Sequence, residues 1–147
     1  MFCIDLSSLK KEIDNYSDGV AIILAAEKSF DFKELQPILN TSKVPIFGAF
    51  FPGLIAESAL HYEGFLLIHY TSDVDVFSFD SKELETVVFE NRSIENGTGL
   101  ILMDGLADGN QDFLNRLFYE LGDSFKFIGS GAGSLDLIQK PCIFDKD

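Results

Sequence analysis

The residues best suited to chemistry in this 147-residue chain follow two short apolar runs near its carboxyl end. Asp104 and Gly105 follow Leu100–Met103, and the glycine-rich stretch 129–133 follows Phe125–Ile128. Glycine lets backbone N–H groups approach a ligand closely, and an aspartate at a strand end is placed to pair with a ligand amine. We therefore predict a small-molecule site lined by Asp104, Gly105, Gly129, Ser130, Gly131 and Ala132.

These residues also have plainer interpretations. The glycine-rich stretch is equally compatible with a tight structural turn, and helix capping suits Asp108. Nucleotide binding is disfavoured, because a phosphate loop opens into a long helix, whereas Leu135–Pro141 is short and ends in proline. A third loop, at 48–53, carries Phe50 and Phe51, which we expect to supply an apolar wall of the site.

Histidines and cysteines form no convincing catalytic set. His61 and His69 are the only histidines, and their spacing with Glu63 matches no established zinc pattern, so we expect them to be structural. Neither Cys3 nor Cys142 has a histidine near it in sequence that would activate a thiol. We therefore predict no catalytic residues, no metal and no cofactor.

Composition indicates one soluble globular domain over residues 1–147. Hydrophobic residues make up 46% of the chain and charged residues 24%, the balance of a packed protein. The formal charge of −13 repels phosphate backbones, so nucleic acid is a disfavoured partner. Phenylalanine occurs 15 times, which implies either a thick aromatic core or an apolar pocket.

Cellular location follows from what the sequence contains. No apolar run approaches the ~18 residues of a membrane span, and the amino terminus lacks the basic-then-apolar pattern of an export signal. Two cysteines in a domain of this size fit reduced, cytosolic usage. We therefore expect a cytoplasmic protein without membrane insertion.

Hydrophobic periodicity predicts the elements that position the candidate site. Amphipathic helices are predicted at 6–16, after Asp31, and along Phe113–Leu121 with a cap from Asp108 or Asn110. Short apolar runs predict buried strands at Val20–Ala26, Val44–Phe47, Leu100–Met103, Phe125–Ile128 and Cys142–Phe144. Residues 59–62 and 65–70 predict a hairpin around Glu63-Gly64, residues 74–79 fit a strand imperfectly, and 81–98 predict a mobile connection.

These elements predict an α/β fold with a mixed, mostly buried β-sheet and packed helices. In an open α/β sheet, the loops that leave the carboxyl ends of the strands line the ligand crevice. We therefore expect the loops 48–53, 104–108 and 129–133 to gather along one edge of the sheet.

Motif order adds a family resemblance. The segment Ile46–Gly53, the run Leu100–Leu106, a helix ending Leu121-Gly122, and Phe127–Gly133 trailed by Cys142–Phe144 resemble the amino-terminal part of the FIST sensory domain. The resemblance spans roughly residues 19–147 by motif order. It implies an intracellular signal-transduction module that binds small ligands such as amino acids or related metabolites. The sequence departs from the family pattern at Ala49–Phe51, which is apolar, and at Ser134, where an acidic residue is usual.

The resemblance also implies a partner. The given sequence contains no counterpart of the family's carboxyl-terminal half. We therefore expect a second copy of the chain or a partner chain to cover the face that this half would cover. The leading hypothesis is therefore a small-ligand-binding sensory module and not an enzyme. Two alternatives stay open: a protein-interaction or oligomerisation module with a phenylalanine-rich docking surface, and a hydrolase-type enzyme.

Overall fold

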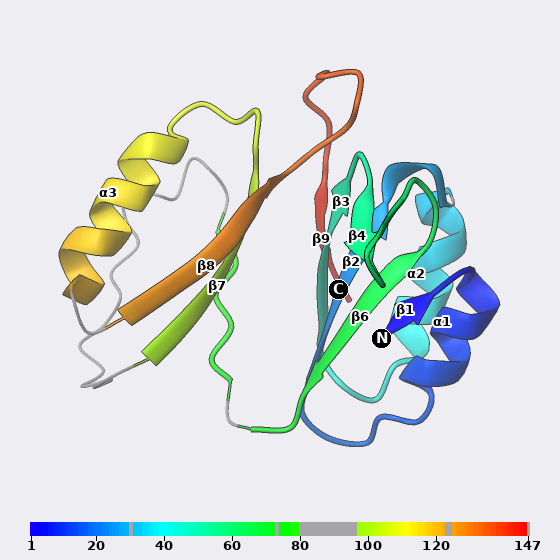
Figure 1. The fold of residues 1–147 in the computed structure, drawn as a ribbon. Coiled ribbons are helices and arrows are strands. Elements are labelled where there is room, and N and C mark those ends of the chain that lie inside the picture. The colour runs from blue at the N-terminus through cyan, green and yellow to red at the C-terminus, as the bar shows by residue number, and fades with distance from the viewer. Residues whose placement is uncertain (30, 73, 80–96, 123–124, 147) are drawn as a thin grey trace.

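The computed structural model describes residues 1–29, 31–72, 74–79, 97–122 and 125–146, so most of the predicted mobile connection 81–98 lies outside the described residues. The described residues form α1 (Leu6–Ile13), α2 (Phe32–Thr41), α3 (Asn110–Leu121) and a short 3-10 turn, η1 (Glu27–Ser29). The strands are β1 (Phe2–Cys3), β2 (Val20–Ala26), β3 (Ile46–Phe51), β4 (Leu54–Ala56), β5 (Ala59–His61), β6 (Phe65–Tyr70), β7 (Gly97–Asp104), β8 (Phe125–Ala132) and β9 (Ile143–Asp145). The predicted α/β fold is confirmed (Figure 1).

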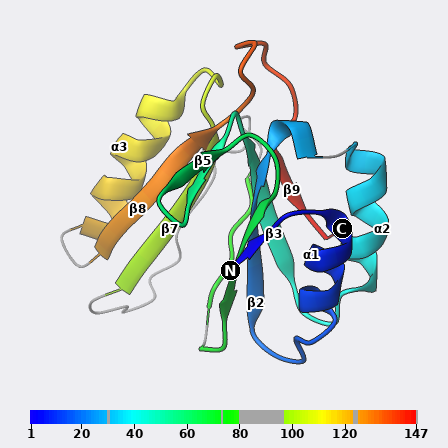
Figure 2. The ribbon, with the colours of Figure 1, turned by 45° about the vertical axis from the view of Figure 1, so that its right-hand side comes forward.

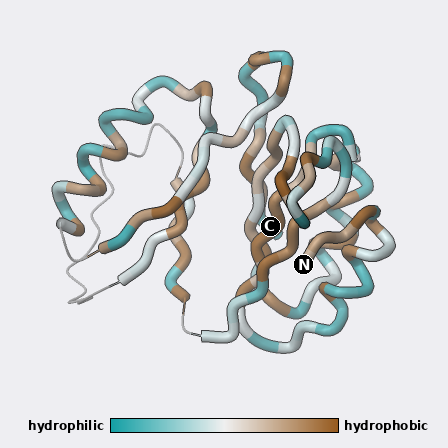
Figure 3. The backbone as a smooth tube through the Cα atoms, viewed as in Figure 1, coloured by the Kyte–Doolittle hydropathy of each residue, from teal (hydrophilic) through white to brown (hydrophobic). Residues whose placement is uncertain are grey.

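The main sheet has the strand order β1-β6-β2-β3-β9. Strands β2 and β3 are parallel, and the other neighbours in this sheet are antiparallel. Strand β2 is central, which explains why its sequence is a continuous apolar run: one of its faces is fully buried and the other is partly buried. In Figure 3 the apolar residues follow these strands, whereas the helices alternate between hydrophobic and hydrophilic positions.

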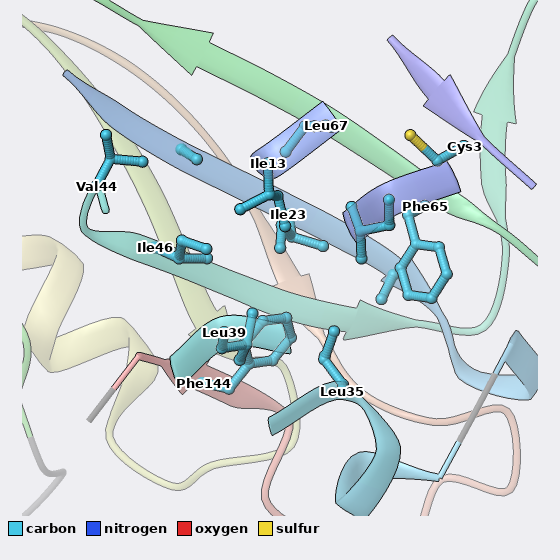
Figure 4. Packing of buried hydrophobic residues seen from close by; sticks show 13 residues of the cluster. Cys3, Ile13, Ile23, Leu35, Leu39, Val44, Ile46, Phe65, Leu67 and Phe144 are labelled. Carbon is cyan, nitrogen blue, oxygen red and sulfur yellow. The ribbon is translucent and has the colours of Figure 1, made fainter. Parts of the chain in front are cut away.

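Helices α1 and α2 cover one face of the main sheet. Their apolar residues recur at helical spacing, and each helix buries two of them almost completely: Leu9 and Ile13 from α1, Leu35 and Leu39 from α2. These side chains pack with sheet residues such as Ile23 (Figure 4). This cluster is the main hydrophobic core.

The helix starts agree with their sequence signals. The Asp5 carboxylate accepts a hydrogen bond from the Ser8 N–H at 2.7 Å, and Asp31 accepts one from the Lys33 N–H at 3.1 Å. Helix α2 begins directly after Asp31 and continues through Pro37. Helix α1 ends at Ile13, earlier than the predicted Tyr16, because Asp14 terminates it and the chain turns toward β2.

A second unit, the β7–α3–β8 unit, stands beside the main sheet (Figures 1 and 2). Its strands β7 and β8 are parallel, and α3 connects them. Helix α3 packs on one face of the pair, where the Phe118 and Phe127 rings meet edge to face with centroids 5.1 Å apart. The unit is thus a single βαβ crossover.

At two glycines the sequence predicted the end of a strand, but both glycines lie within strands. Strand β3 runs past Gly48 to Phe51, and β8 runs past Gly129 to Ala132, so the predicted loops begin later than expected. A Cβ at Gly48 would lie 2.4 Å from the Ile23 carbonyl oxygen, and one at Gly129 would lie 2.3 Å from the Ile101 carbonyl oxygen. Glycine is therefore required at both positions by a neighbouring strand.

The predicted hairpin over 59–70 is wrong. Strand β5 pairs with β4 around Glu57-Ser58, and both turn residues have positive φ angles, 50° and 65°. Strand β6 pairs instead with β1 and β2. The reason is a contact between distant segments: Gly64 donates its N–H to the Ser29 hydroxyl, and its carbonyl accepts from the Ala26 N–H, which directs β6 into the main sheet.

One more predicted element is not found in the structure. Residues 74–79 have no regular secondary structure, so the imperfect strand predicted there is wrong. None of the helices in the described part of the chain is long and apolar enough to cross a membrane.

Candidate functional site

The carboxyl ends of β2, β3, β7 and β8 gather along one edge of the molecule, uppermost in Figure 1. Register pairs Ala26 with Phe51 and Asp104 with Ala132 at these ends. The two units are joined here, because the Gly133 N–H donates to the Phe50 carbonyl at 2.9 Å. A second apolar cluster fills the junction, formed by Ala26, Ala49, Phe51, Leu54, Ala132 and Cys142.

Asp104 ties the loops at this edge together. Its Oδ1 accepts a hydrogen bond from the Leu106 N–H at 2.9 Å, and its Oδ2 accepts one from the Gln139 side-chain amide at 3.1 Å. Its backbone carbonyl accepts from the Asn110 side chain at 2.8 Å. Asp104 therefore fixes the loop after β7 and holds the segment before β9 against it.

The glycine-rich strand lies beside Asp104, as predicted for site residues that act together. Gly105 donates its N–H to the Ala132 carbonyl at 2.8 Å, and a Cβ at Gly131 would lie 3.0 Å from the Gly105 Cα. Gly129 and Ser130 precede them along β8, and both are exposed, whereas Ala132 is buried in the junction. The structure thus brings the predicted backbone groups together as a paired strand and not as a loop.

Phe50 and Phe51 lie on opposite faces of β3. Phe51 is buried in the junction cluster with Ala132. Phe50 instead packs its ring against Phe144 at 4.9 Å and Phe32 at 6.1 Å. Successive side chains in a strand point to opposite sides, so these two rings do not form one wall.

The start of α3 differs from its prediction. The residue before the helix is Gly109, with φ of 87°, and it makes no side-chain capping bond. Asp108 is therefore not the cap, and Asn110 uses its side chain to bind Asp104 instead. A left-handed glycine has no Cβ to clash, which lets the chain turn sharply from the site loop into α3.

Sequence reasoning missed a charged hollow at the same edge. An open hollow of about 540 Å³ is lined by Glu27, Lys28, Leu135 and Asp136. Glu27 and Lys28 directly follow the buried strand β2, so the rule that strand ends line ligand sites would have identified them. Their position was overlooked because the glycine-bearing loops carried the stronger signal.

Lys140 links the two sides of this hollow. Its Nζ lies 2.6 Å from Glu27 Oε1 and 3.5 Å from Asp136 Oδ2. The hydrogen bond from Lys140 is the largest cause that holds the pKa of Glu27 below its ordinary value, and the bond with Glu27 raises the pKa of Lys140. The hydroxyl of Ser134 is the main reason that the pKa of Asp136 is low. All three charges are therefore retained at neutral pH.

The loop between Ser134 and Lys140 is held in one shape by short-range bonds. The Ser134 hydroxyl donates to the Asp136 carboxylate, which also accepts from the Ile138 N–H at 3.1 Å. Leu137 adopts φ of 56°, a region that costs a branched residue about 1–2 kcal/mol. The loop thus presents Leu135, with 61% of its surface exposed, to the hollow and the solvent.

The two thiols are buried. Burial is the largest cause that raises the pKa of Cys142 to about 11, and the Asp104 carboxylate adds to it. Burial likewise raises the pKa of Cys3. Neither thiol is in a disulfide, and both stay protonated near neutral pH, so neither is an activated nucleophile.

No family model matches the chain. The comparisons with curated proteins and with solved structures found no significant match. The candidate site is accordingly defined by its own geometry.

Both histidines make structural contacts. The His69 ring stacks on Tyr16 with centroids 3.8 Å apart, and its Nε2 lies 2.8 Å from the Asp18 carbonyl oxygen. The His61 ring packs on Phe2 at 4.3 Å. They sit on β6 and β5, which do not pair, and the described residues contain no group of three potential metal ligands.

Proposed function

We propose that this chain is a small-ligand recognition module of a sensory system, with the ligand held along the edge where β2, β3, β7 and β8 end. One observation carries the proposal: four strand ends and their loops converge there, and two separate structural units meet. Ligands of open α/β sheets bind outside the carboxyl ends of the strands. The motif-order resemblance to the FIST domain supports the sensory role and a cytoplasmic location.

The side chains at this edge favour binding over turnover. Both thiols are buried and protonated, and both imidazoles are engaged in structural contacts. The polar groups that are exposed at the edge, such as Ser130 and Gln139, suit hydrogen bonding to a ligand. The glycines of β8 keep the backbone accessible beside them.

A melting experiment tests the proposal. A ligand that binds only the folded protein raises its melting temperature by mass action. We expect one compound or more of a panel of amino acids and related metabolites to raise the melting temperature, and Ser130→Glu, which places a charge at the edge, to remove the effect. Ser17→Glu, at an exposed position before β2 and so at the opposite end of the sheet, is the matched control. A panel without any shift would contradict the proposal.

A second candidate function is favoured by the surface of the β7–α3–β8 unit. Leu100 is 43% exposed and Ile128 is 66% exposed, and register places them side by side on neighbouring strands. Clustered exposed apolar side chains mark protein-interaction surfaces. Under this alternative the chain is a docking or oligomerisation module, and sedimentation velocity would show association that Ile128→Asp weakens. A monomer at all concentrations would count against self-association.

A further inference from the structure

We propose that the hollow lined by Glu27, Lys28, Leu135 and Asp136 binds a small monoanionic carboxylate with an apolar body, and that the ligand carboxylate pairs with Lys28. This inference rests on the proposed function, because it names the chemical class of the ligand and the part of the edge that holds it. Neither Glu27 nor Lys28 is among the site residues that were predicted from the sequence.

Lys28 is the group of the hollow with which we expect an anionic ligand to pair. The Lys140 ammonium is engaged with Glu27 and Asp136. Among the residues that the structure describes, no carboxylate is in ion-pair contact with Lys28; its Nζ lies 6.0 Å from the centre of the Tyr62 ring. An anionic group that enters the hollow therefore finds an ammonium that is not already neutralised.

The carboxylates of the hollow are already satisfied by donors of the protein. Glu27 Oε2 accepts a hydrogen bond from the Leu135 N–H at 3.0 Å, in addition to the Lys140 bond at Oε1. Asp136 accepts from Ser134 and from the Ile138 N–H. A cationic ligand would compete with Lys140 for these carboxylates, whereas an anionic ligand would not.

The balance of charge limits the ligand to one negative charge. Two carboxylates and two ammonium groups around the hollow sum to zero, whereas the whole chain has a formal charge of −13. The average surface of the chain repels anions, and the hollow is locally neutral. A dianion such as a phosphate monoester would pair one charge with Lys28 and place the other near Glu27 and Asp136, which opposes binding.

The walls of the hollow are fixed before any ligand arrives. The Ser29 hydroxyl donates to the Ala26 carbonyl at 2.6 Å and accepts from the Gly64 N–H at 2.8 Å, which anchors η1 and thus the backbone of Lys28. Leu135 is held by its bond to Glu27 and supplies exposed apolar surface. Little ordering of the protein is therefore needed on binding.

Titration of the ¹⁵N-labelled full chain with simple probes tests the inference. Hexanoate should shift the backbone amide signals of residues 27–28 and 135–136, and hexylamine and hexyl phosphate should shift them weakly or not at all. Lengthening the carboxylate from butanoate to hexanoate should tighten binding by up to about fourfold per methylene that is buried on Leu135. Equal binding of hexylamine and hexanoate would overturn the inference.

Two lysine variants locate the contact. Lys28→Met keeps the apolar stem and removes the charge, and it should weaken hexanoate binding roughly tenfold or more, the cost of one charge-assisted hydrogen bond. Lys33→Met, an exposed position on α2, is the control and should bind as the unmodified chain does. Unchanged affinity in Lys28→Met overturns the inference. If metabolites raise the melting temperature in a Ser130-dependent way while no carboxylate binds, the inference fails and the proposed function survives; if neither occurs, both fail.

Discussion

The main sheet with α1 and α2 and the β7–α3–β8 unit use similar elements with different results. Each helix of the main sheet buries two large apolar side chains to 1% exposure or less, whereas α3 buries Leu117 and leaves Phe118 and Tyr119 largely exposed. All three helices have the periodicity of an amphipathic helix. What differs is therefore the amount of sheet that each helix has to pack on.

The difference indicates which part of the fold supplies most of its stability. The segment 97–132 is marginal by itself, because so short a chain removes too little apolar surface from water. The β7–α3–β8 unit is held by its contacts at the strand ends, through Ala132, Gly133 and the segment around Cys142. The candidate site lies at this junction, so ligand binding and the attachment of the second unit are expected to be coupled.

The largest expected effect is the difference between removing a buried aromatic ring from the main core and removing a half-exposed one from the β7–α3–β8 unit. Phe65→Ala empties a fully buried position of the main core and should lower the free energy of unfolding by about 3–5 kcal/mol. Phe118→Ala, on the half-exposed side of α3, should cost about 1 kcal/mol. Urea unfolding of both variants measures the difference. Similar losses would show that the two units contribute equally.

Gly129→Ala should destabilise one unit selectively. The added Cβ would meet the Ile101 carbonyl oxygen, so β7 and β8 must separate, at a cost of about 1–3 kcal/mol. Hydrogen exchange should accelerate in β8 and α3 and stay slow in β2 and β3. Gly109→Ala, where no atom lies within 4 Å of the added Cβ, is the control and should suffer only the strain of its positive φ. Uniform acceleration would mean that the units unfold together.

Lys140→Met should lower the free energy of unfolding by an amount that depends on pH. Because the pKa of Glu27 is held below its ordinary value of 4.5, the Glu27–Lys140 bond stabilises the folded chain above that pH and ceases to do so as the pH falls through the lowered pKa. The variant should thus be slightly less stable than the unmodified chain at pH 7, and this difference should disappear as the pH falls through the lowered pKa. The pKa of Glu27 should rise toward its ordinary value in the variant. Carboxyl ¹³C titration measures the shift. A Glu27 pKa that does not change would contradict the ion pair.

The smallest expected effect concerns the rates at which the two thiols are alkylated. A thiol with a pKa of about 11 forms roughly a hundredfold less thiolate at pH 8 than one at 9.0, so Cys142 should be alkylated slowly in the folded chain. Because burial disfavours the thiolate, the fold should lose stability as the pH rises from 9 toward 11. If the junction opens before the core, iodoacetamide should label Cys142 before Cys3, as mass spectrometry would show. Simultaneous labelling would indicate a single cooperative opening.

Local pattern was sufficient for much of the fold. The run Val20–Ala26 is strand β2 as predicted, and the amphipathic stripes correspond to α1, α2 and α3 within a few residues. The α/β class follows from their alternation. Of the candidate site, the pairing of Asp104 and Gly105 with the end of β8 agrees with the expected gathering of strand ends.

Other features were decided by contacts between segments far apart in the chain. The sequence predicted that strands end at Gly48 and Gly129. In the structure, however, each glycine lies within a strand, where a backbone carbonyl of the neighbouring strand leaves no room for a side chain. The choice of partner for β5 and β6 likewise depended on Ser29 and Gly64, which are 35 residues apart. None of these signals is visible in a window of neighbouring residues.

By itself, therefore, the sequence determined which segments are helical or extended and which of their faces are apolar, since periodicity and capping act within a few residues. The tertiary structure alone decided which strands pair, where the glycine-rich strand ends, and that Glu27 and Lys28 face Leu135 and Asp136 across a hollow. The physical reason is that hydrogen bonds between strands join residues that are mostly tens of positions apart, the Glu27–Lys140 ion pair joins residues 113 positions apart, and only the folded chain brings them together.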